Sequence, residues 1–112
     1  MRSRLIDIGA NLTGIASHVF FVDEVFQGIY HGKCLHKPDL LQVLQRAQAA
    51  NIDKIMLTAS SQQDLEGAIQ LIPQIQSGLT LKTTVGVHPC RVKELNQEML
   101  SAMIGMAKEH AH

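Results

Sequence analysis

Apolar residues along the chain follow two different spacings, and together these predict three strand–helix pairs. Short apolar runs are typical of buried strands, and the third run is rich in β-branched residues. Apolar residues that recur every three to four positions instead predict helices with one buried face. The predicted strands cover residues 5–9, 52–58 and 79–87. The predicted helices cover residues 38–51, 61–73 and 95–107.

Local signals mark the ends of these helices. Asp39 suits the first turn of a helix, because a carboxylate complements the helix dipole there. Ser61 followed by Asp64 resembles a capping box, and Pro73 predicts an end or a kink. Residues 14–37 show no sustained period, so we expect them to form a long loop.

The order of elements, β-α-β-α-β-α, predicts an α/β fold with parallel strands joined by helices. A closed (β/α)8 barrel needs about 250 residues, whereas this chain has 112. Neither a Gly-x-Gly-x-x-Gly pattern nor a P-loop follows the first strand, so the usual nucleotide-binding folds lose their main support. We therefore expect one domain that forms the first three β/α units of a TIM (β/α)8 barrel and leaves the barrel incomplete.

The balance of charge argues against a protein that coats nucleic acid by electrostatics alone. Ten basic and ten acidic residues give a formal net charge of zero. Hydrophobic residues make up 46% of the chain, which argues against disorder. The basic residues are scattered, with Lys33 and Lys37 in the expected loop and Arg91 and Lys93 after the third strand. We expect no strong basic patch. The charge balance does not argue against an enzyme that binds phosphate at a local site.

The sequence shows no sign of export or of membrane insertion. Its first residues are briefly basic, but no apolar signal core follows, and the apolar stretch at residues 19–22 is far too short to cross a bilayer. Cys34 and Cys90 lack Cys-x-x-Cys spacing, so we expect two reduced thiols. These features predict a cytoplasmic or nuclear protein without a membrane partner.

Polar residues gather where the three predicted strands end. They are Asp7, Gly9 and Asn11 at the first strand, Thr58, Ser60 and Ser61 at the second, and His88 at the third. Because active sites of α/β barrels lie at the carboxyl ends of the strands, we expect these residues to share one face. Each also has a plain structural alternative, such as capping a loop or the following helix.

Three segments resemble signatures of the TatD family of metal-dependent deoxyribonucleases. Residues 7–13, Asp-Ile-Gly-Ala-Asn-Leu-Thr, resemble the family's opening motif. Residues 25–32, Val-Phe-Gln-Gly-Ile-Tyr-His-Gly, resemble the loop that follows in its eukaryotic branch. Residues 84–89, Thr-Val-Gly-Val-His-Pro, are similar to its third-strand signature. The resemblance covers almost the whole chain, with the motifs in the family's order.

The resemblance implies a TIM barrel whose divalent metal (magnesium or manganese, with zinc as an alternative) serves the hydrolysis of phosphodiester bonds in DNA. Metals suit this chemistry because they activate water and neutralise phosphate charge. Many members carry two histidine ligands in an Asp-x-His-x-His motif on the first strand, and Gly9 and Asn11 occupy those positions here. By the same resemblance, His88 is the expected catalytic residue near the scissile phosphate, and Asn11 and His88 are expected to bind the substrate.

The family's later metal ligands are missing from this sequence. Its fourth-strand Gly-Glu-x-Gly-Leu-Asp motif is absent, and Glu109, His110 and His112 precede the expected place without matching it. We therefore assign no metal ligand in this chain and interpret residues 1–112 as the amino-terminal part of a TatD-like hydrolase domain, with the remainder of the barrel absent. Deleting residues 14–22 would restore the family's uninterrupted loop, so we interpret that segment as an insertion.

Three functions stay open at this point. The first is that of the family, in which metal-activated water hydrolyses DNA, carried out by a longer parent protein. The second is a non-catalytic truncated product or partner-binding fragment, which the missing ligands favour for this chain. The third is a metal-dependent hydrolase of other small esters, and assays on DNA and on simple esters distinguish it from the first.

Overall fold

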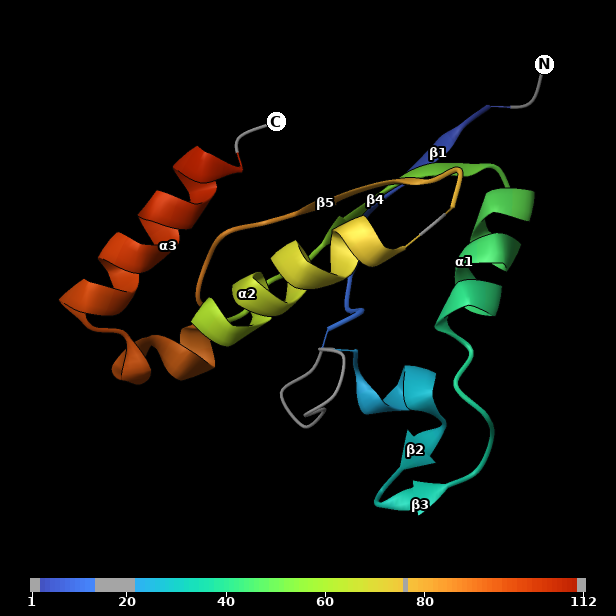
Figure 1. Cartoon of the computed structure of the whole chain (residues 1–112), viewed down its shortest axis with the longest axis horizontal. Helices are drawn as coiled ribbons and strands as arrows, with labels where there is room; N and C mark the ends of the chain where they lie inside the picture. The colour runs from blue at the N-terminus through green and yellow to red at the C-terminus, as the bar shows by residue number, and fades with distance from the viewer. Residues whose placement is uncertain (1–2, 14–21, 76, 111–112) are drawn as a thin grey trace.

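The main sheet has three parallel strands in the order β1-β4-β5. The computed structural model describes residues 3–13, 22–75 and 77–110. The strands are β1 (Leu5–Ala10), β4 (Ile52–Leu57) and β5 (Thr80–Thr83). The helices are α1 (Leu40–Ala49), α2 (Gln62–Leu71) and α3 (Gln97–Glu109) (Figure 1). The predicted alternation of parallel strands and helices is therefore confirmed.

The segment predicted as a long loop contains more structure than expected. It holds the 3-10 helix η1 (Glu24–Gln27) and an antiparallel hairpin of β2 (Ile29–Tyr30) and β3 (Lys33–Cys34). The hairpin turns on His31 and Gly32, which have φ values of 50° and 78°. The loop prediction is thus wrong between η1 and β3, because strands of two residues are too short to show a period of two. Residues 14–21 of the predicted loop lie outside the described residues.

Local hydrogen bonds explain where α2 begins and ends. The Ser61 hydroxyl accepts from the Asp64 N–H at 3.2 Å, and the Asp64 carboxylate accepts from the Ser60 N–H at 3.1 Å. This confirms the predicted capping signal, with the carboxylate reaching one residue further back than the standard box. At the other end the chain tightens into the 3-10 helix η2 (Ile72–Gln74), which contains Pro73.

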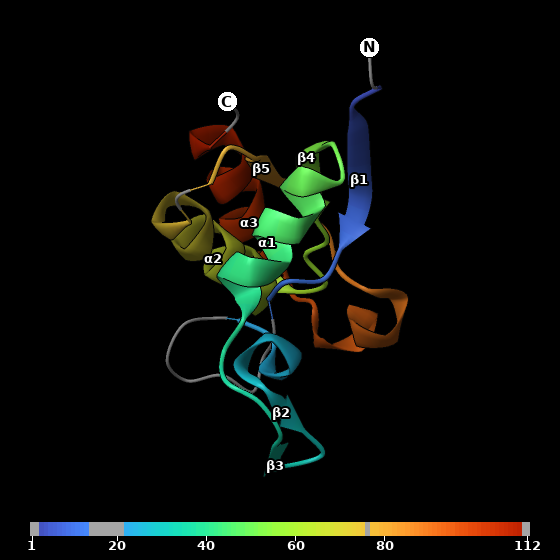
Figure 2. The same cartoon turned by 90° about the vertical axis from the view of Figure 1, so that its right-hand side faces the viewer.

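The core lies on one side of the sheet, between its strands and α1 and α2. Leu44 from α1, Leu57 from β4 and Leu65 from α2 are each 1% exposed. By contrast Ile6 and Ile8 on β1 are 58% and 79% exposed. Figure 2 shows β1 standing at the edge of the molecule, with the helices gathered on one side of the sheet. The apolar residues of β1 therefore contribute little to this core.

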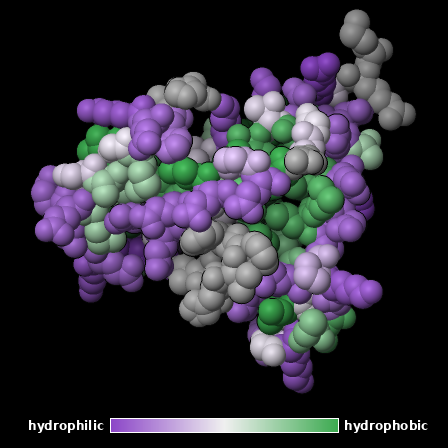
Figure 3. Space-filling view, viewed as in Figure 1, coloured by the Kyte–Doolittle hydropathy of each residue, from purple (hydrophilic) through white to green (hydrophobic). Residues whose placement is uncertain are grey.

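The third helix packs on α2 through a second, smaller cluster, which contains Ala59, Leu65 and Met103. The outward side of α2 is polar, and Figure 3 shows it as a hydrophilic band with apolar surface beside it. The 3-10 helix η3 (Pro89–Glu94) leads into α3.

Within the described residues, no helix is long and apolar enough to cross a membrane.

Strand β5 is shorter than the sequence predicts. It ends at Thr83 instead of extending to residue 87. Its partner β4 ends at Leu57, whose carbonyl accepts from the Thr84 N–H at 2.9 Å. Beyond that bond, no regular ladder continues among the residues that the structure describes. A high β-propensity cannot extend a strand without a neighbouring strand to pair with, which is why the prediction was too long.

Candidate active site at the carboxyl ends of the strands

Backbone hydrogen bonds bring together the segments that follow the three strands. The Thr58 N–H donates to the Ala10 carbonyl at 2.9 Å, and the His88 N–H donates to the Ser60 carbonyl at 2.8 Å. Since β4 is the central strand, Asn11 and His88 lie on either side of the β4 end. We call this region the strand-end site. These contacts confirm that the segments with Asn11, Thr58, Ser60 and His88 share one edge. The prediction is wrong for Asp7 and Gly9, which lie within β1 and not after it.

The ring of His88 has a defined hydrogen-bonding state. Its Nδ1 accepts from the Cys90 N–H at 3.0 Å, so the proton of the neutral imidazole lies on Nε2. The residue caps the start of η3, where Pro89 occupies the first turn, and its side chain is exposed. The hydrogen bond at Nδ1 therefore leaves Nε2–H as the ring donor of an exposed residue.

Asn11 is exposed at the end of β1, next to a well-anchored neighbour. Leu12 is 5% exposed, and its carbonyl accepts from the Asp23 N–H at 2.9 Å. Val22, which forms an isolated bridge with Thr13, is also buried. The backbone around Asn11 is therefore held in place, and Asn11 itself is exposed in the described part of the chain. Of the predicted insertion at 14–22, residues 14–21 lie outside the described residues.

Two other residues that were predicted at the strand ends, Asp7 and Ser61, form local structural hydrogen bonds. The Asp7 carboxylate accepts from the nearby Gly9 N–H at 2.9 Å, and Ser61 caps α2. Sequence reasoning missed Thr84, whose hydroxyl accepts from the Ala59 N–H at 3.0 Å and so ties the end of β5 to that of β4. A lone threonine at the end of a β-branched strand offers no signal for this role, because its partner lies 25 positions away.

The side chains of the strand-end site do not form a metal-binding set. No group of three or more His, Cys, Asp or Glu side chains within the described part of the chain can hold a metal ion. Glu109 and His110 lie at the far end of α3, and His112 falls outside the described residues. We therefore assign no step of a reaction to a metal held by the described residues.

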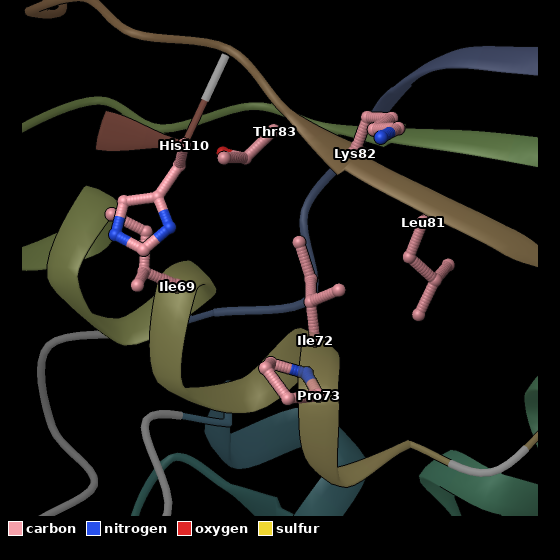
Figure 4. Close-up of a pocket in the computed structure, with 7 residues that line it drawn as sticks. All are labelled: Ile69, Ile72, Pro73, Leu81, Lys82, Thr83 and His110. Atoms are coloured by element: carbon pink, nitrogen blue, oxygen red, sulfur yellow. The ribbon is translucent and has the colours of Figure 1, made fainter. Parts of the chain in front are cut away.

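A cavity of about 230 Å³ lies elsewhere, between α2, β5 and the end of α3. Its lining residues are Ile69, Ile72, Pro73, Leu81, Lys82, Thr83 and His110. Figure 4 shows the His110 ring beside Ile69, facing α2. Most of this lining is apolar and includes no carboxylate, so the cavity lacks the groups that the strand-end site offers for phosphate chemistry. The two cysteines, Cys34 and Cys90, are free, as predicted, and both are exposed.

The parallel sheet with helical crossovers and its polar strand-end site define an α/β protein of the kind that carries its chemistry at the carboxyl ends of strands. Two curated proteins named Deoxyribonuclease Tat-D are similar to the chain. That of Saccharomyces cerevisiae is 39% identical over 90 residues, which is 79% of this chain and 19% of that protein. That of Schizosaccharomyces pombe is 36% identical over 90 residues, which is 80% of this chain and 25% of that protein.

Two solved structures are also similar to the chain. A hydrolase of the TatD family from Entamoeba histolytica aligns with 99% of this chain and 35% of its own, at 37% identity and a TM-score of 0.79. An uncharacterized amidohydrolase from Saccharomyces cerevisiae aligns with 96% of this chain and 28% of its own, at 32% identity and a TM-score of 0.69. No family model matches the chain. The chain belongs to the TatD family of hydrolases, and it spans about a fifth to a quarter of the length of the curated relatives.

Proposed function

We propose that this protein hydrolyses phosphodiester bonds of DNA, with the strand-end site on the substrate side of the reaction. The observation that carries the proposal is the Nε2–H of His88, which the Cys90 N–H orients through Nδ1. Curated relatives bear the name deoxyribonuclease, which supports DNA as the substrate.

In this proposal the residues of the chain bind the phosphate and stabilise its charge. Negative charge builds on the phosphate oxygens as water attacks phosphorus, and a preoriented donor stabilises that charge most. His88 donates through Nε2–H, and the Asn11 amide donates to a second oxygen or accepts from the substrate. Neither residue moves a proton in this scheme, since both act through hydrogen bonds already available in their neutral forms.

We also propose that the activity depends on magnesium or manganese, with zinc as the alternative. The support is membership in the family, because a divalent ion supplies activated water and neutralises phosphate charge. The described residues offer no three-ligand group for such an ion. This same observation favours a second candidate for the chain by itself, a non-catalytic polypeptide that keeps only the substrate-binding edge.

The test is cleavage of end-labelled single-stranded DNA by the purified chain in magnesium, manganese or EDTA. His88→Ala removes the proposed donor, and we expect the rate to fall by about 10²–10³-fold, as for loss of one preoriented donor. His110→Ala is the matched control, since His110 is an exposed histidine at the end of α3. We expect that variant to keep the wild-type rate.

Each outcome separates the candidates. Cleavage that persists in EDTA contradicts metal dependence, and equal rates for the two histidine variants contradict the role of His88. A chain that is folded by circular dichroism but cleaves nothing supports the non-catalytic candidate. Hydrolysis of p-nitrophenyl acetate without hydrolysis of DNA favours the third possibility, a hydrolase of small esters.

A further inference from the structure

The hairpin formed by β2 and β3 projects away from the sheet and helices. Both Figure 1 and Figure 2 show the hairpin standing clear of the sheet and the α-helices. In Figure 2 the arrowhead of β1 points toward the end of the molecule that carries the hairpin. It is attached near the strand-end site, because the Asp23 N–H before η1 donates to the Leu12 carbonyl at 2.9 Å. The hairpin therefore extends the carboxyl-end side of β1.

The hairpin and the residues after it carry only positive charge. From Val25 to Pro38 the chain contains Lys33 and Lys37 but no aspartate or glutamate, although the whole chain has a net charge of zero. Both lysines are exposed, and neither forms an ion pair with any described residue. Exposed Leu35 lies between them in sequence, at 67% exposure.

Hydrogen bonds connect the hairpin to the residues directly before and after it. The His36 Nδ1–H donates to the Lys37 carbonyl at 2.7 Å, so its Nε2 accepts from the Tyr30 hydroxyl at 3.1 Å. The two rings lie 5.5 Å apart at an angle of 59°, and Tyr30 remains 36% exposed. The Leu35 N–H also donates to the Gly28 carbonyl at 2.7 Å. A ligand can therefore bind Lys33 and Lys37 without first ordering the backbone that carries them.

We propose that this hairpin binds the DNA strand outside the reaction site, with Lys33 and Lys37 on backbone phosphates and Tyr30 against a base. Exposed cations beside an aromatic ring are the combination that binds single-stranded nucleic acid without sequence preference. The proposal rests on the proposed function for its choice of DNA as the partner. It gives the substrate a second point of contact on the β1 side, apart from His88.

The experiment measures binding of the whole chain to a short fluorescein-labelled single-stranded oligonucleotide by anisotropy, at several salt concentrations. The test variant is Lys33→Gln/Lys37→Gln. Its control is Arg46→Gln/Lys108→Gln, which makes the same change of charge at exposed positions on α1 and α3. We expect the Kd of the test variant to rise about tenfold, and its salt dependence to fall by about 1.4 in log–log slope, at ~0.7 per phosphate contact. The control should change Kd less than about twofold.

A third variant, Tyr30→Leu, tests the aromatic contact. It should raise the Kd by about fivefold or more and leave the salt slope unchanged, because stacking involves no counterions. Equal effects of the two double variants would overturn the proposal, as would a wild-type chain that does not bind at low salt. Poly-glutamate that competes as strongly as unlabelled oligonucleotide would overturn the assignment to nucleic acid.

The outcome is independent of catalysis. Binding that depends on the hairpin in a chain that never cleaves DNA would refute the proposed function and keep this inference. Cleavage that depends on His88, together with a KM unaffected by Lys33→Gln/Lys37→Gln, would support the proposed function and refute this inference.

Discussion

Only one of the two ring nitrogens of His88 accepts the Cys90 N–H, and this decides which nitrogen can donate a hydrogen bond to a ligand. Nδ1 is occupied by the Cys90 N–H, which leaves Nε2–H as the free donor. The bond spans two positions in sequence and depends on the backbone turning into η3 after Pro89. A single local contact therefore shapes both the start of that 3-10 helix and the proposed contact with phosphate.

Gly28, directly before the hairpin, has a backbone conformation and surroundings that suit only glycine. Its φ of +83° disfavours side chains, and a Cβ at this position would collide with the His36 carbonyl. We expect Gly28→Ala to open the hairpin, since the backbone conformation alone costs roughly 1–3 kcal/mol. Hydrogen exchange of the Leu35 amide, which donates to the Gly28 carbonyl at 2.7 Å, measures that opening directly.

Gly32 provides the matched control. It has a similar φ of +78°, but nothing lies within 4 Å of a Cβ placed there. Gly32→Ala should therefore show only the conformational cost, about 1–2 kcal/mol. If both variants speed exchange of the Leu35 amide equally, the contact between Gly28 and His36 does not constrain the hairpin.

Among the regular elements, α2 has the most complete capping. Its Ser61 hydroxyl accepts from the Asp64 N–H at 3.2 Å, and Ser61 is itself buried. Ser61→Ala should lower the free energy of unfolding by about 1 kcal/mol, the usual cost of losing a cap. Urea unfolding followed by circular dichroism measures the change.

The control for the cap is Ser101→Ala on α3. Ser101 is exposed inside the helix, where alanine has the higher helix propensity. This variant should be neutral or slightly more stable than wild type. If both substitutions lowered the free energy of unfolding equally, the hydrogen bond of the Ser61 hydroxyl would contribute nothing to stability.

Local signals were sufficient for the three helices and the central strand. Helical spacing and a capping serine are properties of neighbouring residues, so the sequence alone placed α2 and β4 to within a residue or two. The hairpin and the end of β5 were predicted wrongly, because each depends on a strand partner. A strand forms only where a second segment pairs with it, so the residues of one short stretch of sequence do not predict its length.

At the scale of the whole molecule, the described residues cover one side of the sheet and leave β1 and β5 at its edges. Parallel sheets are normally covered on both faces, yet β1 exposes Leu5, Ile6 and Ile8. The radius of gyration is 14.9 Å, above the about 13 Å of a compact domain near this length. The stability of the chain should therefore come almost entirely from the interface of the sheet with α1 and α2.

Two substitutions compare these regions. Leu57→Ala removes a side chain that is 1% exposed, and it should lower the free energy of unfolding by about 2–5 kcal/mol. Ile8→Ala changes a side chain that is 79% exposed, and its effect should stay within about 0.5 kcal/mol. Urea unfolding of both variants measures the contrast. An Ile8→Ala cost near that of Leu57→Ala would show that β1 is covered in solution.

The sequence by itself determined the order of the three main-sheet strands and the three α-helices, the family, and which residues follow β4 and β5. These properties are carried by spacing and by short motifs, such as the segment that ends in His88-Pro89, and both can be read without coordinates. Only the tertiary structure decided that Asn11 and His88 flank the end of β4, and that Nδ1 of His88 is already occupied. Such relations depend on hydrogen bonds between segments that meet only when the sheet forms, and for the same reason the exposure of β1 emerged only in three dimensions.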